Sequence, residues 1–138
     1  MKRFLIISLI SLFLLPGCGG QTNLIENNPE ISVSNAEQRF NDPSVTIIDV
    51  RTEEEYLTSH ISNSLLIPLD TIENEILNHS EISKNSEIIV YCRSGKRSMN
   101  ALTKLVSLGY SNVKSLAGGI TSWTEASKKV CKNTEKTC

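Results

Sequence analysis

One cysteine, Cys92, lies between a short apolar segment and a run of cationic residues. Residues 88–91 (IIVY) are apolar and mostly β-branched, which predicts a buried strand that ends just before the cysteine. Arg93, Lys96 and Arg97 follow within five residues. Nearby cations favour the thiolate, which is the nucleophilic form of a cysteine. The spacing therefore predicts a reactive thiol, although a cysteine after a strand can also be a small buried apolar side chain.

The residues that follow Cys92 are also suited to holding an anion. From Met99 onward, apolar residues recur at intervals of three and four, which predicts a helix that ends near Gly109. A turn that leads into a helix N-terminus directs several backbone N–H groups at one point, and this geometry favours anions. Six loop residues are therefore predicted to bind the substrate around the cysteine: Arg93, Ser94, Gly95, Lys96, Arg97 and Ser98.

Strands and helices are predicted to alternate along the chain. Strands are expected at residues 31–33, 45–50, 65–68, 88–91 and 113–116. Helices are expected to begin at Ser34, Thr52 and Asp70, because each has a glutamate three residues later, as in a capping box. A last helix is expected after Gly118-Gly119 and carries Trp123, predicted to lie in the core. This order predicts an α/β fold with an open, mostly parallel five-stranded sheet and helices on both faces.

In such a sheet, ligands bind outside the carboxyl ends of the strands. Cys92 and Gly118 are predicted at or just past those ends, and Asp49 lies near the end of the strand at 45–50. Asp49 is therefore a further candidate for lining the substrate site. It could equally form a buried structural pair with Arg51, and both alternatives remain open from sequence.

Several motifs, in order and at matching spacing, resemble a rhodanese domain. They are DVRTEEEY at 49–56, HI at 60–61, IPL at 67–69, YCRSGKRS at 91–98, GY at 109–110, NV at 112–113 and LAGGITSW at 116–123. The resemblance runs from about Ile31 to Ala126. It implies a thiosulfate sulfurtransferase whose cysteine, here Cys92, carries sulfur as a persulfide to a thiol or to cyanide. It also implies that the cations of the loop attract a small anionic sulfur donor.

The resemblance also bears on neighbouring functions. Phosphatases and arsenate reductases of this fold use a loop one residue longer than the six residues from Cys92 to Arg97, and they carry an arginine where this chain has Ser98. Sulfur chemistry is therefore favoured, and a non-catalytic binding module is the alternative. The family usually has glycine before the histidine, where this chain has Ser59 before His60. His60 is expected to be a hydrogen-bonded structural residue rather than a member of the site.

The N-terminus resembles a bacterial lipoprotein signal peptide. A basic start at Lys2-Arg3 and an apolar stretch at 4–15 precede Leu-Pro-Gly-Cys, which ends at Cys18. This stretch of twelve residues, apolar except for two serines, is too short for a comfortable membrane span. The expected organisation is a signal peptide at 1–17, a polar tether at 18–30 beginning with a lipidated Cys18, a rhodanese domain at 31–127 and a tail at 128–138. The protein would then be anchored to a cell membrane by lipid on its extracytoplasmic or periplasmic side, and an ordinary secretory signal is the alternative.

Charge and composition exclude some partners. Removing residues 1–17 takes away Lys2 and Arg3 and leaves 12 basic residues against 15 acidic ones, a net charge of −3. Nucleic-acid binding requires a clustered basic face, so it is not expected. We also expect no metal and no cofactor.

Two further cysteines, Cys131 and Cys138, lie in the lysine-rich tail beyond the resemblance. In an oxidising compartment, two cysteines seven residues apart favour a local disulfide, with two free thiols as the alternative.

Overall fold

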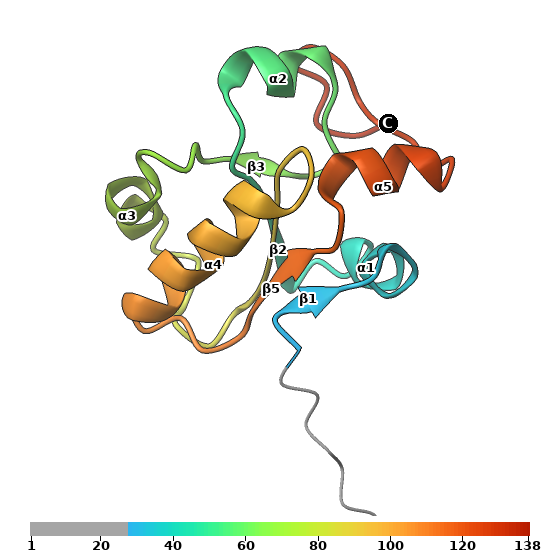
Figure 1. Cartoon of the computed structure of the whole chain (residues 1–138). Coiled ribbons are helices and arrows are strands. Elements are labelled where there is room, and N and C mark those ends of the chain that lie inside the picture. The colour runs from blue at the N-terminus through green and yellow to red at the C-terminus, as the bar shows by residue number, and fades with distance from the viewer. Residues whose placement is uncertain (1–27) are drawn as a thin grey trace, which may run out of the picture.

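The structure is a computed structural model that describes residues 28–138. Within that range strands and helices alternate from the first element onward (Figure 1). In chain order they are β1 (Glu30–Ile31), α1 (Val33–Phe40), β2 (Val45–Asp49), α2 (Glu53–Thr58), β3 (Leu65–Leu66), α3 (Ile72–Glu75), η1, a single 3₁₀ turn (Ile76–Asn78), β4 (Glu87–Tyr91), α4 (Lys96–Ser107), β5 (Val113–Leu116) and α5 (Gly119–Glu125).

The five strands form one sheet in the order β1-β5-β4-β2-β3, and every neighbouring pair is parallel. β4 lies at the centre and pairs along its whole length with β2, from Val45 opposite Glu87 to Asp49 opposite Tyr91. The two-residue strand β3 is at one edge, where Pro68, which lacks a backbone N–H, interrupts no ladder. The predicted fold class, a five-stranded parallel α/β sheet, is confirmed.

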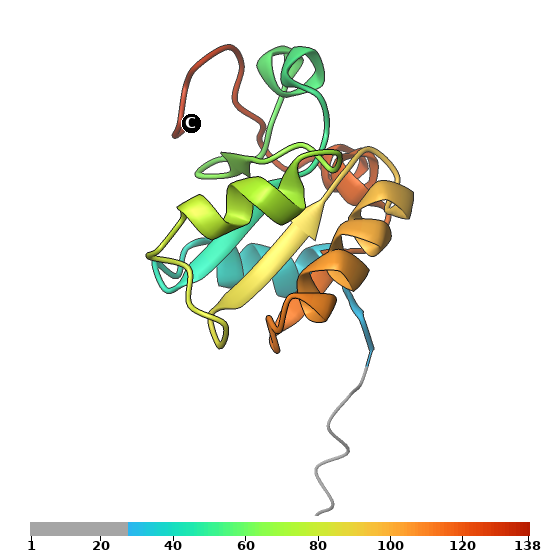
Figure 2. The same cartoon turned by 90° about the vertical axis from the view of Figure 1, so that its left-hand side faces the viewer.

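Helices cover both faces of the sheet. Successive side chains of a strand point to opposite faces, so each strand contributes to two separate cores. Val90 of β4 and Cys92, directly after it, belong to a core shared with α3 and α4, whereas Ile89 and Tyr91 of β4 belong to a second core shared with α1 and α5. Figure 2 shows α3 and α4 in front of the strands and α1 behind them. Trp123 of α5 is 6% exposed in the second core, as expected.

Two of the three predicted helix starts differ from the structure. The cap of α1 is Ser32, whose side chain accepts a hydrogen bond from the N–H of Asn35, so the helix begins before Ser34. α3 begins after Thr71 rather than at Asp70, and no side-chain cap bond is present. The capping box of Thr52 and Glu55 is confirmed, with both reciprocal hydrogen bonds formed. The two wrong starts share one reason: two short polar residues lie at each helix start, Ser32 and Ser34 or Asp70 and Thr71, and the sequence pattern does not choose between them.

The C-terminal tail (residues 128–138) packs back on the domain beside α2 (Figure 1). Cys131 and His60 exchange backbone hydrogen bonds of 3.0 and 2.8 Å, and Asn133 N–H donates to the Leu57 carbonyl. Cys131 and Cys138 are joined by a disulfide. Across residues 28–138, none of the helices has the length and apolar character needed to cross a bilayer.

Candidate active site

Cys92 follows the last residue of the central strand and faces the start of α4. Its side chain is 1% exposed, and it is the free cysteine of the described range. The backbone N–H of Gly95 donates to Cys92 Sγ at 3.2 Å, and the Ser98 hydroxyl lies 3.6 Å from the same atom. The sulfur therefore sits in a nest of donors at a helix N-terminus, as the sequence pattern predicts.

The turn around the sulfur depends on Gly95. This residue caps α4 with φ of +98°, a conformation that L-amino acids with a side chain rarely adopt. A Cβ at this position would meet only ordinary contacts, the nearest at 3.6 Å, so the requirement is conformational rather than spatial. Glycine here lets the chain reverse within three residues and present its N–H to Sγ.

Opposing effects act on the Cys92 thiol. Burial raises its pKa, because a charged sulfur loses water. Hydrogen bonds from the Ser98 hydroxyl and from the backbone N–H groups of Ser98, Ser94 and Gly95 lower the pKa and together outweigh burial. The net pKa lies below its ordinary value, so the thiolate is the form that this loop stabilises. The lowering comes from the hydroxyl and the backbone N–H groups, which the sequence pattern predicts together with the cations of the loop.

The start of α5 forms backbone hydrogen bonds to the cysteine loop. The N–H groups of Ile120 and Thr121, in the first turn of α5, donate to the carbonyls of Cys92 and Arg93 at 2.8 and 3.1 Å. Gly119 allows this approach, because a Cβ there would lie 2.3 Å from the Cys92 carbonyl oxygen. The sequence indicated only a turn at this position, and the contact explains why the turn needs glycine.

The predicted binding residues of the loop divide into two groups. Arg93, Ser94 and Lys96 are exposed, and neither cation has an ion-pair partner among residues 28–138. Arg97, in contrast, donates two hydrogen bonds of 2.7 Å to the carboxylate of Glu55 on α2. The hydrogen bond from Arg97 is the main cause that lowers the pKa of Glu55 to about 2. The charge available to an anionic donor is thus carried by Arg93 and Lys96.

Asp49 forms a buried structural pair, one of the two roles that the sequence left open. It is fully buried, and its carboxylate accepts from Nε and Nη2 of Arg51 at 2.6–3.1 Å. Arg51 Nη2 also donates to the Ser59 carbonyl at 2.6 Å. This pair ties the end of β2 to the end of α2, which places Glu55 above the cysteine loop.

His60 is buried and has a structural environment. Its Nδ1 lies 2.9 Å from the Tyr56 carbonyl oxygen and its Nε2 lies 2.6 Å from the Glu135 carbonyl oxygen of the tail. Its ring stacks on Tyr56 with 3.8 Å between centroids. Both ring nitrogens are therefore occupied by backbone groups, which agrees with the structural role expected.

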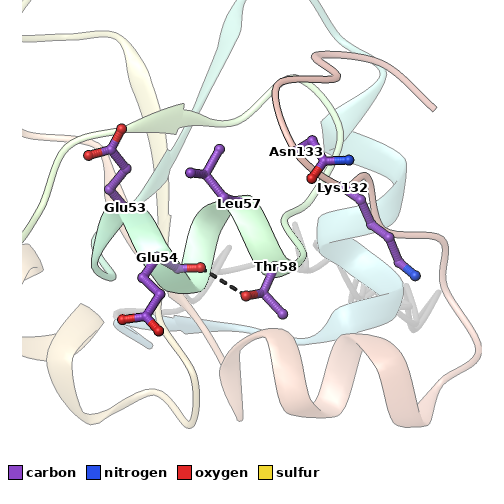
Figure 3. A pocket seen from close by; sticks show the side chains of 6 residues that line it. All are labelled: Glu53, Glu54, Leu57, Thr58, Lys132 and Asn133. Carbon is purple, nitrogen blue, oxygen red and sulfur yellow. Dashed lines mark hydrogen bonds between the residues drawn. The ribbon is translucent and has the colours of Figure 1, made fainter.

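A cleft of about 480 Å³ opens beside the cysteine loop. It lies between α2, α5 and the loop, and its lining includes Arg51, Glu54, Glu55, Arg93 and Thr121. A larger hollow, of about 670 Å³, lies elsewhere, between α2 and the tail. Figure 3 shows Glu53 and Glu54 at one end of this hollow and Lys132 and Asn133 at the other. The lining of this hollow includes no residue of the cysteine loop, whereas the smaller cleft is lined by Arg93, the residue after Cys92, so the smaller cleft is the candidate site.

Sequence reasoning missed one buried hydroxyl. Ser115 of β5 is fully buried and lies 2.8 Å, oxygen to oxygen, from Ser98. The signal was present, because Ser115 alternates with Val113 along the strand and so faces the same core. Cys18 lies outside the described residues, and no cluster of potential metal ligands occurs within 28–138.

The comparisons with known proteins agree with this geometry. The sequence profile of the rhodanese-like domain matches residues 32–126. The chain belongs to the rhodanese-like domain family. A protein named sulfurtransferase from Allochromatium vinosum is 37% identical over 95 residues, which cover 68% of this chain and 86% of that protein. A putative mitochondrial thiosulfate sulfurtransferase from Schizosaccharomyces pombe is 36% identical over 99 residues, covering 64% and 68% of the two chains.

Solved structures of rhodanese-like proteins share the fold of this chain. The crystal structure of a rhodanese-related protein from Thermoplasma volcanium has a TM-score of 0.65 and 27% identity, and covers 74% of this chain and 96% of that chain. The tail and residues 28–31 extend beyond the family match. The rhodanese-like domain therefore contains Cys92, its loop, the α5 turn and Ser115, but not the disulfide.

Proposed function

We propose that this rhodanese-like domain is a sulfurtransferase that moves sulfane sulfur through a persulfide on Cys92. The observation that supports it most directly is the donor nest around a buried sulfur, formed by Gly95 N–H and the Ser98 hydroxyl. The lowered pKa of the Cys92 thiol favours the thiolate, which is the form that attacks sulfur. The names of the two curated relatives support sulfur transfer as the class of reaction.

The proposed reaction has two displacements. Cys92 thiolate attacks the outer sulfur of thiosulfate, the sulfur–sulfur bond of the donor breaks, and sulfite leaves with the electron pair. The product is a Cys92 persulfide, whose negative charge remains close to the backbone N–H groups that held the thiolate. An acceptor thiolate or cyanide then attacks the outer sulfur, and Cys92 leaves as the thiolate. No external oxidant or reductant is needed.

The cleft beside the loop offers the approach for donor and acceptor. Arg93 lines it and Lys96 is exposed on the same loop, so a dianionic donor meets two cations that have no ion-pair partner within residues 28–138. Arg97 is bound to Glu55 and acts on the donor only through the field of the pair. Thiosulfate fits this charge pattern, and the name of the S. pombe relative supports it as donor.

We further propose that the protein works outside the cytoplasm, anchored by lipid on Cys18. The support is the order of basic residues, apolar stretch and Leu-Pro-Gly-Cys in the sequence. The Cys131–Cys138 disulfide is compatible with an oxidising compartment.

The test of sulfur transfer is direct. Incubation of the protein with thiosulfate should add about 32 Da, one sulfur atom, to the peptide that contains Cys92, and cyanide should remove it as thiocyanate. Cys92→Ser should fold and make no thiocyanate, because a serine hydroxyl is not ionised at neutral pH. Sulfur found only on Cys131 or Cys138, or activity in Cys92→Ser, would contradict the mechanism. A folded wild-type protein that takes up no sulfur would favour the non-catalytic binding module.

A further inference from the structure

The buried hydroxyl of Ser115 has no explanation in the packing of the core. Ser115 pairs with Val90 across the β4–β5 ladder and lies two residues after Val113, on the face that α4 covers. Neighbouring positions on this face carry apolar side chains, and a buried hydroxyl is unfavourable unless it is hydrogen-bonded. Its side-chain partner within residues 28–138 is the hydroxyl of Ser98.

Counting hydrogens shows which serine donates. Each hydroxyl carries one hydrogen. The Ser98 oxygen has three neighbours in range: Cys92 Sγ at 3.6 Å, the Gly95 carbonyl at 2.9 Å and the Ser115 hydroxyl at 2.8 Å. The Ser115 oxygen has the Ser98 hydroxyl alone among the described side chains. Both hydrogens are used only when Ser115 donates to Ser98, because the opposite direction leaves the Ser115 hydrogen buried without an acceptor.

When Ser115 donates to Ser98, the Ser98 hydrogen is free to be donated to another acceptor, the Gly95 carbonyl or Cys92 Sγ. The Gly95 carbonyl already accepts the N–H of Met99 at 3.0 Å, so it keeps a partner if Ser98 turns away. A charged sulfur attracts the hydroxyl more strongly than a neutral carbonyl does. A hydroxyl that accepts one hydrogen bond is also polarised into a better donor. The chain Ser115–Ser98–Cys92 is thus arranged to respond to negative charge on the sulfur.

We propose that Ser115 is a positioning residue: its hydroxyl donates to Ser98 and so directs the Ser98 hydrogen to Cys92 Sγ in the thiolate. Ser115 does not touch the sulfur and acts through Ser98. The inference rests on the proposed function of Cys92 as the nucleophile. It adds a buried residue of β5, outside the cysteine loop, to the machinery that holds the charged sulfur.

The experiment compares Ser115→Thr with Ser115→Val in the full chain. Both side chains are β-branched and nearly equal in shape, and they differ in the hydroxyl. The rate at which iodoacetamide alkylates Cys92 is measured against pH, with the Cys92 peptide quantified by mass spectrometry. Threonine should keep the wild-type profile, and valine should shift the midpoint upward by about half a pH unit, a roughly threefold loss of thiolate below the midpoint. If valine fails to fold, the smaller Ser115→Ala supplies the same comparison.

A double variant separates this role from a merely structural one. Ser98→Ala should raise the midpoint, and Ser98→Ala with Ser115→Val should raise it no further, because the path runs through Ser98. Ser64→Ala is the matched control: it removes a buried hydroxyl that contacts the Tyr91 hydroxyl at 3.0 Å, and Tyr91 lies in the core on the other face of the sheet. This control should leave the midpoint unchanged.

Two results would overturn the proposal: a folded Ser115→Val protein with the wild-type profile, or shifts from the Ser98 and Ser115 changes that simply add. The alkylation assay contains no sulfur donor, so it tests Ser115 independently of sulfur transfer. A failure of the thiosulfate experiment alone would instead count against the proposed function.

Discussion

Arg97 and Glu55 form a two-point ion pair, with Nη1 to Oε2 and Nη2 to Oε1 both at 2.7 Å. Arg97 ends the cysteine loop and lies in the first turn of α4, and Glu55 is the third residue of α2. The same carboxylate completes the capping box at Thr52. The Glu55 side chain therefore caps the start of α2 and also neutralises Arg97, although the two residues are 42 positions apart in the sequence.

This pair gives the first prediction. Arg97→Ala should raise KM for thiosulfate about tenfold, because it leaves the Glu55 carboxylate unneutralised beside the donor. The free energy of unfolding should fall by about 1 kcal/mol or less, since both partners are partly exposed. Steady-state kinetics and urea unfolding measure the two effects. Lys104→Ala is the control, because it breaks the Lys104–Glu73 pair on the same helix; an equal rise in KM there would refute the local explanation.

The pair also predicts a dependence of stability on pH. The folded state lowers the pKa of Glu55 from 4.5 to about 2. A carboxyl group with a lowered pKa stabilises the fold above its unfolded pKa, and this contribution disappears as pH falls toward the folded value. Urea unfolding between pH 5 and pH 2 should therefore show a steeper loss of stability in the wild type than in Glu55→Gln. Identical slopes would show that the pair contributes nothing measurable.

Arg93 and Lys96 are predicted to capture the anionic donor. Arg93→Ala and Lys96→Ala should each raise KM for thiosulfate several-fold, with a larger effect at low salt, because exposed charges act through a screened field. Kinetics at two ionic strengths provide the measurement. Lys84→Ala is the matched loss of charge, since Lys84 precedes β4 at the opposite end of the sheet and lies over the Tyr110 ring. An equal effect from Lys84→Ala would indicate net charge rather than a local site.

Gly119 is predicted to be intolerant of a side chain. Gly119→Ala places a Cβ 2.3 Å from the Cys92 carbonyl oxygen and 2.7 Å from the Arg93 carbonyl group, at φ of +60°. The free energy of unfolding should fall by about 2–4 kcal/mol, with loss of most activity as the cysteine loop shifts. Gly109→Ala is the control, because φ is also positive there, at +91°, but a Cβ meets nothing within 4 Å. It should cost only about 1 kcal/mol. Equal losses would assign the effect to backbone strain alone.

The tail disulfide should stabilise the domain modestly. Cys138→Ser should lower the free energy of unfolding by at most about 2–3 kcal/mol, because the closed loop is small. Reductant should reproduce this loss in the wild type and have no effect on Cys138→Ser, as urea unfolding would show. Thiol titration of a denatured, unreduced Cys18→Ser variant should find Cys92 alone. Three titrating thiols would exclude the bridge.

Lipidation of Cys18 remains a prediction from sequence. The protein should partition into a detergent phase and carry a diacylglycerol on Cys18, and Cys18→Ala should accumulate as an unprocessed precursor. Mass spectrometry of the N-terminal peptide provides the measurement. A soluble, correctly trimmed Cys18→Ala protein would indicate an ordinary secretory signal instead.

The sequence by itself determined the order of elements and the position of Cys92, the proposed nucleophile. Both depend on neighbours in the chain: the apolar run at 88–91, the glycine turn at Gly95 and the helical spacing after Met99 define Cys92 at a strand end without reference to distant residues. The capping box at Thr52 and Glu55 was equally readable, because its two partners are three residues apart.

Only the tertiary structure decided which side chains pair with one another around the cysteine loop. Arg97 is neutralised by Glu55, Asp49 pairs with Arg51 in the core, and Ser98 meets Ser115 across 17 residues. Local pattern cannot assign such contacts, because one cation or hydroxyl can reach several partners, and the packing of helices on a sheet selects among them. The docking of the tail on His60 has the same origin: residues 75 positions apart meet because α2 and the tail lie side by side above the ends of the strands.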